Sequence, residues 1–248
     1  MNRHFAQLHR DPVALTDAVS LFVETGLRRG NGVVCVAEPA HSDLVLTRVR
    51  DMDMDPGAFL KSGQLEVLDA RATLAQVTVG DMPDWVEFRR VLGEVLDRVR
   101  LCGRGTTRVY GEMVNVLWRD GRAPAAIRME EFWNELARVY QFSLFCSYML
   151  DAHQDESYAG PLEEIGRTHS DILGTAEDER FRVALDSASR DVFGVPLSQM
   201  VGFSTQARDG ERRFPSGQRT MLWVKRNLPS ASAAVLERAR RYYEESLH

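Results

Sequence analysis

The stretch VVCVA, residues 33–37, decides the fold class of this 248-residue chain. Its five apolar residues stand between Gly32 and the pair Glu38-Pro39. A short, continuous apolar run bounded by glycine and proline is typical of a strand that is buried on both faces, and such strands belong to parallel sheets. The sequence therefore predicts a parallel sheet that is covered by helices on both sides.

The segments on either side of this run alternate between helix and strand patterns. Asp11-Pro12 marks a helix start, because a capping side chain precedes a proline at the first helical position, and this helix is expected to end near Arg29. The other elements expected in this region are helices at about 42–50, 56–61, 83–103 and from 124, and strands at 65–68, 108–110 and 142–150. This alternation predicts a three-layer α/β fold with a mainly parallel sheet.

The character of the chain changes after Leu173, where no further segment resembles a doubly buried strand. Helices are expected at 216–226 and 230–246, divided at Pro229 because proline forbids a continuous helix. We therefore predict a first domain over 1–173 and a helical extension over 174–248. An apolar stripe on the last helix, from Val235 to Tyr243, favours packing inside the extension, and a dimer or partner surface is the alternative.

Composition limits the classes of function. The formal net charge of −5 argues against direct binding of nucleic acid, which relies on lysine and arginine to neutralise phosphates. We expect a soluble cytoplasmic protein, because no run of about 18 apolar residues occurs and the first residues lack the pattern of a secretory signal. The 3 cysteines are far apart and odd in number, which is typical of free thiols.

Ligands of parallel sheets bind beyond the carboxyl ends of the strands. Residues 37–42 follow the first buried strand at the place where a RecA-type ATPase carries its phosphate-binding loop. Such a loop needs glycines to wrap the phosphates, a lysine for charge and a serine or threonine for magnesium. Here the residues read AEPAHS, in which proline removes an amide donor and Glu38 would repel a triphosphate. We therefore expect no ATP hydrolysis and no catalytic residues.

Two further constellations are candidates for a ligand site. Glu112 directly follows a predicted strand, where an ATPase could place a water-activating group; here it either holds a hydrogen-bond network or ligand, or is a solvated carboxylate. Glu130, Trp133 and Asn134 share one side of a predicted helix. An aromatic ring beside an amide and a carboxylate is typical of a pocket wall, although packing of Trp133 in the core is the alternative.

Metal and nucleophile patterns are absent from the sequence. The 6 histidines do not occur at HxH, HxxxH or cysteine–histidine spacings, so no zinc or iron site is predicted. No GxSxG motif occurs, and no cofactor is identified. His153 and His169 could face the strand-end site, with a surface or helix-capping role as the alternative.

Several motifs, in this order, resemble the MEDS sensory domain of DcmR-type regulators, which is related to the RecA/KaiC fold. The likeness covers about residues 4 to 170. The segments that carry it are His4, GLRRG (26–30), His41, GQL (63–65), LDA (68–70), YGEMV (110–114), LW (117–118), ME (129–130), WN (133–134), Leu136 and CSY (146–148). The resemblance implies a ligand-sensing domain with a degenerate phosphate-binding loop, commonly attached to a DNA-binding, kinase or other signalling module. No such module is recognisable in this chain.

The sequence thus predicts a cytoplasmic, non-enzymatic regulatory protein for signal transduction, such as the regulation of transcription. It is expected to bind a small apolar or aromatic molecule and to signal through its helical extension, a partner protein or a homodimer. The residues expected at the ligand site are Glu38, His41, Asp69, Glu112, Met113, Glu130, Trp133, Asn134, Tyr148 and His169. The alternatives are an ATPase with an atypical loop and a purely protein-binding regulator.

Overall fold

A computed structural model describes residues 3–202 and 214–247 of the chain. The described residues form two compact units, Met1–Met149 and Leu150–His248, which we take in turn. The predicted α/β class is confirmed. The predicted boundary between domains at residue 173 stays a prediction, because the division at residue 149 reflects packing alone.

The first unit is built on a parallel sheet. Its strands are β1 (His4–His9), β2 (Val33–Ala37), β3 (Leu65–Asp69), β6 (Thr107–Gly111) and β7 (Phe142–Met149). They lie in the order β3-β2-β6-β7-β1, and each neighbouring pair is parallel. All five residues of β2 are buried, as the apolar run predicted. A short antiparallel pair, β4 (Thr78–Val79) and β5 (Met82–Pro83), stands apart from this sheet.

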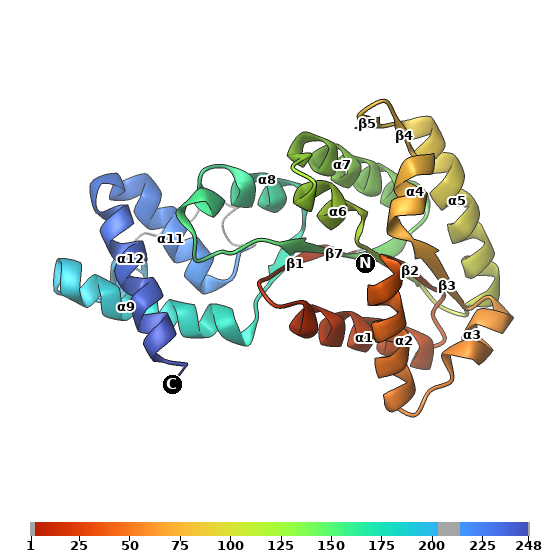
Figure 1. Cartoon of the computed structure of the whole chain (residues 1–248), viewed down its shortest axis with the longest axis horizontal. Helices are drawn as coiled ribbons and strands as arrows, with labels where there is room; N and C mark the ends of the chain where they lie inside the picture. The colour runs from red at the N-terminus through yellow and green to blue at the C-terminus, as the bar shows by residue number, and fades with distance from the viewer. Residues whose placement is uncertain (1–2, 203–213, 248) are drawn as a thin grey trace. The chain divides into compact units, whose positions relative to one another are not determined.

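Helices cover both faces of the sheet (Figure 1). They are α1 (Pro12–Arg28), α2 (Pro39–Asp51), α3 (Pro56–Ser62), α4 (Ala70–Gln76), α5 (Trp85–Cys102), α6 (Met113–Arg119) and α7 (Ala123–Val139). The first three lie on one face, and the other four lie on the opposite face. The predicted three-layer arrangement is therefore confirmed.

The core of the first layer joins α1 and α2 to the sheet. Phe22 of α1 meets Phe145 of β7 edge-on, with ring centroids 5.5 Å apart, and Cys35 of β2 belongs to the same apolar cluster. Gly32, just before β2, lies so close to α5 that an added Cβ atom would stand 2.7 Å from the backbone oxygen of Val99. Only glycine lets these two elements approach so closely.

The junction between β2 and α2 differs from the expected loop. The sequence suggested a loop over 37–42 and a helix from residue 42, whereas β2 ends at Ala37 and α2 already begins at Pro39. Proline suits the first helical position, because its fixed φ angle is helical and its missing N–H has no partner there in any case. Glu38 alone therefore connects the strand to the helix.

The second unit is mainly helical. Its elements are η1 (Asp155–Tyr158), α8 (Pro161–Thr168), β8 (Asp171–Leu173), α9 (Ala176–Phe193), α10 (Leu197–Gly202), α11 (Ser216–Asn227) and α12 (Pro229–Glu245). The apolar stripe of α12 includes Val235 and Ala239, which are fully buried, and α12 packs against α9. The stripe thus serves packing inside this unit. No helix within residues 3–202 and 214–247 is both long and apolar enough to cross a membrane.

Candidate functional site

A cavity of about 740 Å³ lies at the carboxyl edge of the sheet in the first unit. Its walls come from residues that follow β1, β2 and β6, together with the last residue of β7. The lining residues are Pro12, Leu15, Thr16, Glu38, Pro39, Ala40, His41, Leu44, Glu112, Asn115, Arg119 and Met149. This is where the topology of a parallel sheet places a ligand.

Glu112 and His41 form the polar centre of this cavity. Glu112 is 4% exposed, and its Oε2 accepts a hydrogen bond of 2.8 Å from the backbone N–H of Glu38. Its Oε1 lies 3.2 Å from Nδ1 of His41. The other ring nitrogen of His41, Nε2, is buried and has no hydrogen-bond partner within the part of the chain that the structure describes. A buried nitrogen without a hydrogen bond is costly, so His41 has an unused capacity for one hydrogen bond beside the cavity.

The side chain of Glu38 is held by two arginines. Its Oε1 accepts a hydrogen bond of 2.7 Å from Nε of Arg71, and its Oε2 accepts one of 2.7 Å from Arg119. Arg71 also forms an ion pair of 3.1 Å with Asp120. Desolvation acts to raise the pKa of Glu38, but the hydrogen bonds and charges of Arg71 and Arg119 outweigh it and lower this pKa. The charge of Glu38 is therefore balanced within the protein.

Two buried groups that interact electrostatically with the polar centre, His9 and Cys35, are neutral near pH 7. Burial, followed by the charge of His41, lowers the pKa of His9 to about 4, although Asp11 acts in the opposite direction. Burial, followed by the charge of Glu112, raises the pKa of Cys35 to about 12. Neither residue lines the cavity, and neither adds a charge next to it at neutral pH.

Sequence reasoning missed two residues of α6 that line the cavity. Asn115 is 1% exposed, and its Oδ1 accepts a hydrogen bond of 2.9 Å from the backbone N–H of Met149. Arg119 follows one helical turn later and bonds Glu38. The available signal was a lone asparagine inside the apolar run MVNVLW, residues 113–118, directly after a strand.

Two residues expected at the site have structural roles near it. Asp69 ends β3 and caps α4, because its Oδ1 accepts hydrogen bonds from the backbone N–H groups of Arg71 and Ala72. Met113 is fully buried at the start of α6. Neither is among the residues that line the cavity, and their role in ligand binding stays a prediction.

The expected residues of α7 and β7 lie in a different place. Glu130 is fully buried and accepts a hydrogen bond of 2.5 Å from the hydroxyl of Tyr148, while Oδ1 of Asn134 lies 2.9 Å from Nδ1 of His4. Trp133 packs edge-on against Phe88, with ring centroids 4.9 Å apart, which fits the core alternative. None of these side chains is part of the cavity lining.

His169, the last of the expected residues, belongs to the second unit. Its Nδ1 lies 2.7 Å from the backbone oxygen of Ile165 and 3.1 Å from the hydroxyl of Thr168. These contacts lie at the end of α8, which is the helix-capping role considered for this histidine. Of the ten expected residues, the structure therefore brings Glu38, His41 and Glu112 together in one cavity.

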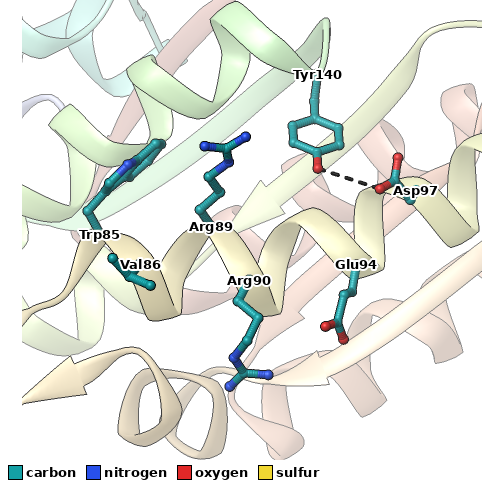
Figure 2. Close-up of a pocket in the computed structure, with 7 residues that line it drawn as sticks. All are labelled: Trp85, Val86, Arg89, Arg90, Glu94, Asp97 and Tyr140. Atoms are coloured by element: carbon teal, nitrogen blue, oxygen red, sulfur yellow. Dashed lines mark hydrogen bonds between the residues drawn. The ribbon is translucent and has the colours of Figure 1, made fainter.

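A second hollow, of about 380 Å³, lies along α5 (Figure 2). The hydroxyl of Tyr140 donates a hydrogen bond of 3.5 Å to Asp97, while Arg90 and Glu94 extend away from it. These two charged side chains and Asp97 belong to exposed residues, so water already solvates them. The strand-end cavity, with its buried polar centre, is the better candidate for recognition.

Comparison with known proteins decides the family. The model of the family described as MEDS, the methanogen/methylotroph, DcmR sensory domain, matches residues 3–170. The chain belongs to the MEDS family. The MEDS match includes β1, β2, β3, β6 and β7 of the first unit and every residue of the strand-end cavity. No curated protein matches the chain. Membership in a family of sensory domains indicates a sensing or regulatory role.

Proposed function

We propose that this chain is a regulatory protein whose MEDS domain senses a small, mainly apolar molecule bound in the strand-end cavity. The observation that carries this proposal is a cavity of about 740 Å³ whose polar centre pairs the buried Glu112 with His41, which is 12% exposed. Small-molecule sites are commonly apolar cavities of about 300–1,000 Å³ with a few placed polar groups. This cavity has the same combination.

The lining groups offer a ligand two kinds of contact, apolar surface and one hydrogen-bond acceptor. Leu15, Leu44 and Met149 provide apolar surface, and removing that surface from water favours binding. Glu112 orients His41: when Nδ1–H of His41 donates to this carboxylate, Nε2 is left as an acceptor. The arrangement therefore favours an apolar molecule with a single hydroxyl or N–H donor, such as an alcohol or a phenol.

We also propose that the protein senses and does not catalyse. Both oxygens of Glu112 are engaged, one by the backbone N–H of Glu38 and one by His41, so this carboxylate is poorly placed to activate water. The chain after β2 enters α2 at Pro39, which leaves no glycine-rich segment to wrap phosphates. A signal then requires that the ligand bind two conformations with different affinity, and the helical extension or a partner protein is the route we propose for it.

The experiment compares two matched variants of the full chain. Leu44 lines the cavity and is 57% exposed, whereas Leu21 is 58% exposed on α1 and is not a lining residue. A panel of phenol, benzyl alcohol, cyclohexanol and toluene is titrated by calorimetry into the wild type. We expect Leu44→Trp to weaken binding of the best probe by about tenfold, because its indole fills part of the cavity, and Leu21→Trp to leave binding unchanged.

Equal effects of the two variants, or no binding of any probe, would overturn the assignment of the cavity. The donor requirement is tested by the ratio of phenol to toluene affinity, which should fall in His41→Phe. Magnesium ATP at millimolar concentration is the contrasting probe, and we expect no binding. Binding of the nucleotide, with turnover that Glu112→Gln abolishes, would favour an ATPase.

A further inference from the structure

A second cluster of buried polar side chains lies between the sheet and α7, away from the lining of the cavity. His4 comes from β1, Cys146 from β7 and Glu130 from α7, and the three side chains are between 0% and 8% exposed. Because Cys146 pairs with Ala6, the parallel register places Cys146 and His4 on the same face of the sheet. Helix α7 then brings Glu130 over that face.

The three donor atoms form a nearly equilateral triangle. Nε2 of His4 lies 3.1 Å from Oε2 of Glu130 and 3.4 Å from Sγ of Cys146, and Sγ lies 3.4 Å from the same Oε2. A tetrahedral zinc ion, with bonds of about 2.0 to 2.3 Å, holds its donors roughly 3.3 to 3.6 Å apart. One ion could therefore bond all three atoms with shifts of a few tenths of an ångström.

The surrounding groups orient two of these donors. Nδ1 of His4 lies 2.9 Å from Oδ1 of Asn134, an acceptor that favours a proton on Nδ1 and leaves Nε2 as a lone pair. The second oxygen of Glu130 accepts a hydrogen bond of 2.5 Å from Tyr148. Metal-bound histidines usually donate their other N–H to a nearby acceptor, and metal-bound carboxylates are themselves hydrogen-bonded. Both features are present here.

Electrostatics in this cluster require a positive charge or shared protons. When Nε2 of His4 carries no proton, its lone pair faces Oε2 of Glu130, which is 3.1 Å away. Two acceptor atoms at that distance need a proton or a cation between them. A bound divalent cation would replace these protons and balance a thiolate and a carboxylate together.

We propose that His4, Glu130 and Cys146 bind one divalent transition metal ion of the zinc class, with any further donor coming from outside this set. Sulfur and imidazole donors select against Mg²⁺ and Ca²⁺, which prefer oxygen ligands. The spacing of the histidines in the sequence predicted no zinc site. The structure assembles one from residues that are 142 and 16 positions apart, which a local motif cannot reveal.

The experiment uses the full chain, stripped with a chelator and titrated with Co²⁺. A thiolate bound to Co²⁺ gives a charge-transfer band in the near ultraviolet, and we expect that band to saturate at one ion per chain. Cys146→Ser should abolish it. Cys35→Ser removes a buried thiol from β2 and Cys102→Ser removes an exposed one, so both are matched controls that should keep the band.

Two further measurements test the metal site even if Cys146→Ser does not fold. Tyr148→Phe keeps the ring but removes the hydrogen bond to Glu130, so Co²⁺ affinity should fall about tenfold. X-ray absorption of the Zn²⁺-loaded wild type should show one sulfur at about 2.3 Å beside nitrogen or oxygen donors. Failure of the wild type to retain one ion, or an equal band in Cys146→Ser, would show that shared protons fill the cluster.

Discussion

At the scale of single residues, Glu112 and His41 illustrate how a polar pair can be buried without a large penalty. Glu112 is buried beside the cavity, yet one oxygen takes a backbone N–H and the other faces a ring nitrogen. Buried polar groups are tolerated when hydrogen bonds replace the water that they lose. Nε2 of His41 is left without a described partner, and it is the atom through which the proposed ligand would be recognised.

His9 makes stability depend on pH in a defined window. Its pKa is lowered from 6.5 to about 4 in the folded protein, mainly by burial, so between these two pH values the unfolded chain binds the proton more tightly. Stability must therefore be complete above about pH 6.5 and fall as the pH drops towards 4. From pH 7 to pH 5 the free energy of unfolding should fall by about 2 kcal/mol through this group.

Urea unfolding at pH 7 and pH 5 measures this effect in the wild type and in His9→Gln. Glutamine does not titrate, so the variant should lose about 2 kcal/mol less stability than the wild type over the same interval. Because the free energies of unfolding at pH 7 and pH 5 are compared within each protein, any pH-independent effect of the substitution on stability cancels. Identical pH dependence in the two proteins would show that His9 is not the group responsible.

At the scale of elements, close approach between β2 and α5 depends on one glycine. A Cβ atom at Gly32 would stand 2.4 Å from Cγ1 of Val99 and 2.7 Å from the backbone oxygen of the same residue. A side chain can move away from such a contact, but a helix backbone cannot do so without shifting α5. Gly32→Ala should therefore lower the free energy of unfolding by about 1 to 3 kcal/mol.

The matched control for this substitution is Gly57→Ala in α3. The nearest atom to a Cβ at Gly57 is Oδ1 of Asp55, at 3.1 Å, and this side-chain atom needs to move by only a few tenths of an ångström, which keeps its hydrogen bond to the N–H of residue 57. Alanine also suits a helix better than glycine, so the control should be neutral or slightly stabilising. Thermal unfolding of both variants gives the comparison. Equal losses of stability would mean that the β2–α5 contact is not tight in solution.

At the scale of the whole molecule, two different positions for the end of the first domain can be compared by experiment. The MEDS match ends at residue 170, whereas the first compact unit ends at Met149. We expect a fragment of residues 1–173 to fold on its own, because it contains the whole family match and the complete core of the first unit. Far-ultraviolet circular dichroism and a cooperative thermal transition would show this.

The full chain and a shorter fragment, residues 1–149, complete that experiment. If the longer fragment folds and the shorter one does not, the domain ends near residue 173, as the sequence predicted. If both fold alike, the boundary at Met149 is sufficient. A longer fragment that stays unfolded would show that the helical extension is needed for folding and would contradict the predicted division.

The sequence by itself determined the class of fold and the edge of the sheet at which to look. Both follow from local patterns: the apolar run at 33–37 identifies a buried parallel strand, and the chain direction then locates the carboxyl ends of its neighbours. The short helices α4 and α6 were not foreseen, because each has only 7 residues and neither begins with a proline of the kind that marked the equally short α3.

Only the tertiary structure decided which polar side chains meet. Glu112 and His41 face each other because they follow neighbouring strands, whereas Glu130 and Asn134, expected in the same pocket, lie with His4 on another surface of the sheet. Strand register and helix rotation set such contacts, and both depend on how distant apolar faces pack. A single sequence shows which faces are apolar, but the packed fold alone selects their partners.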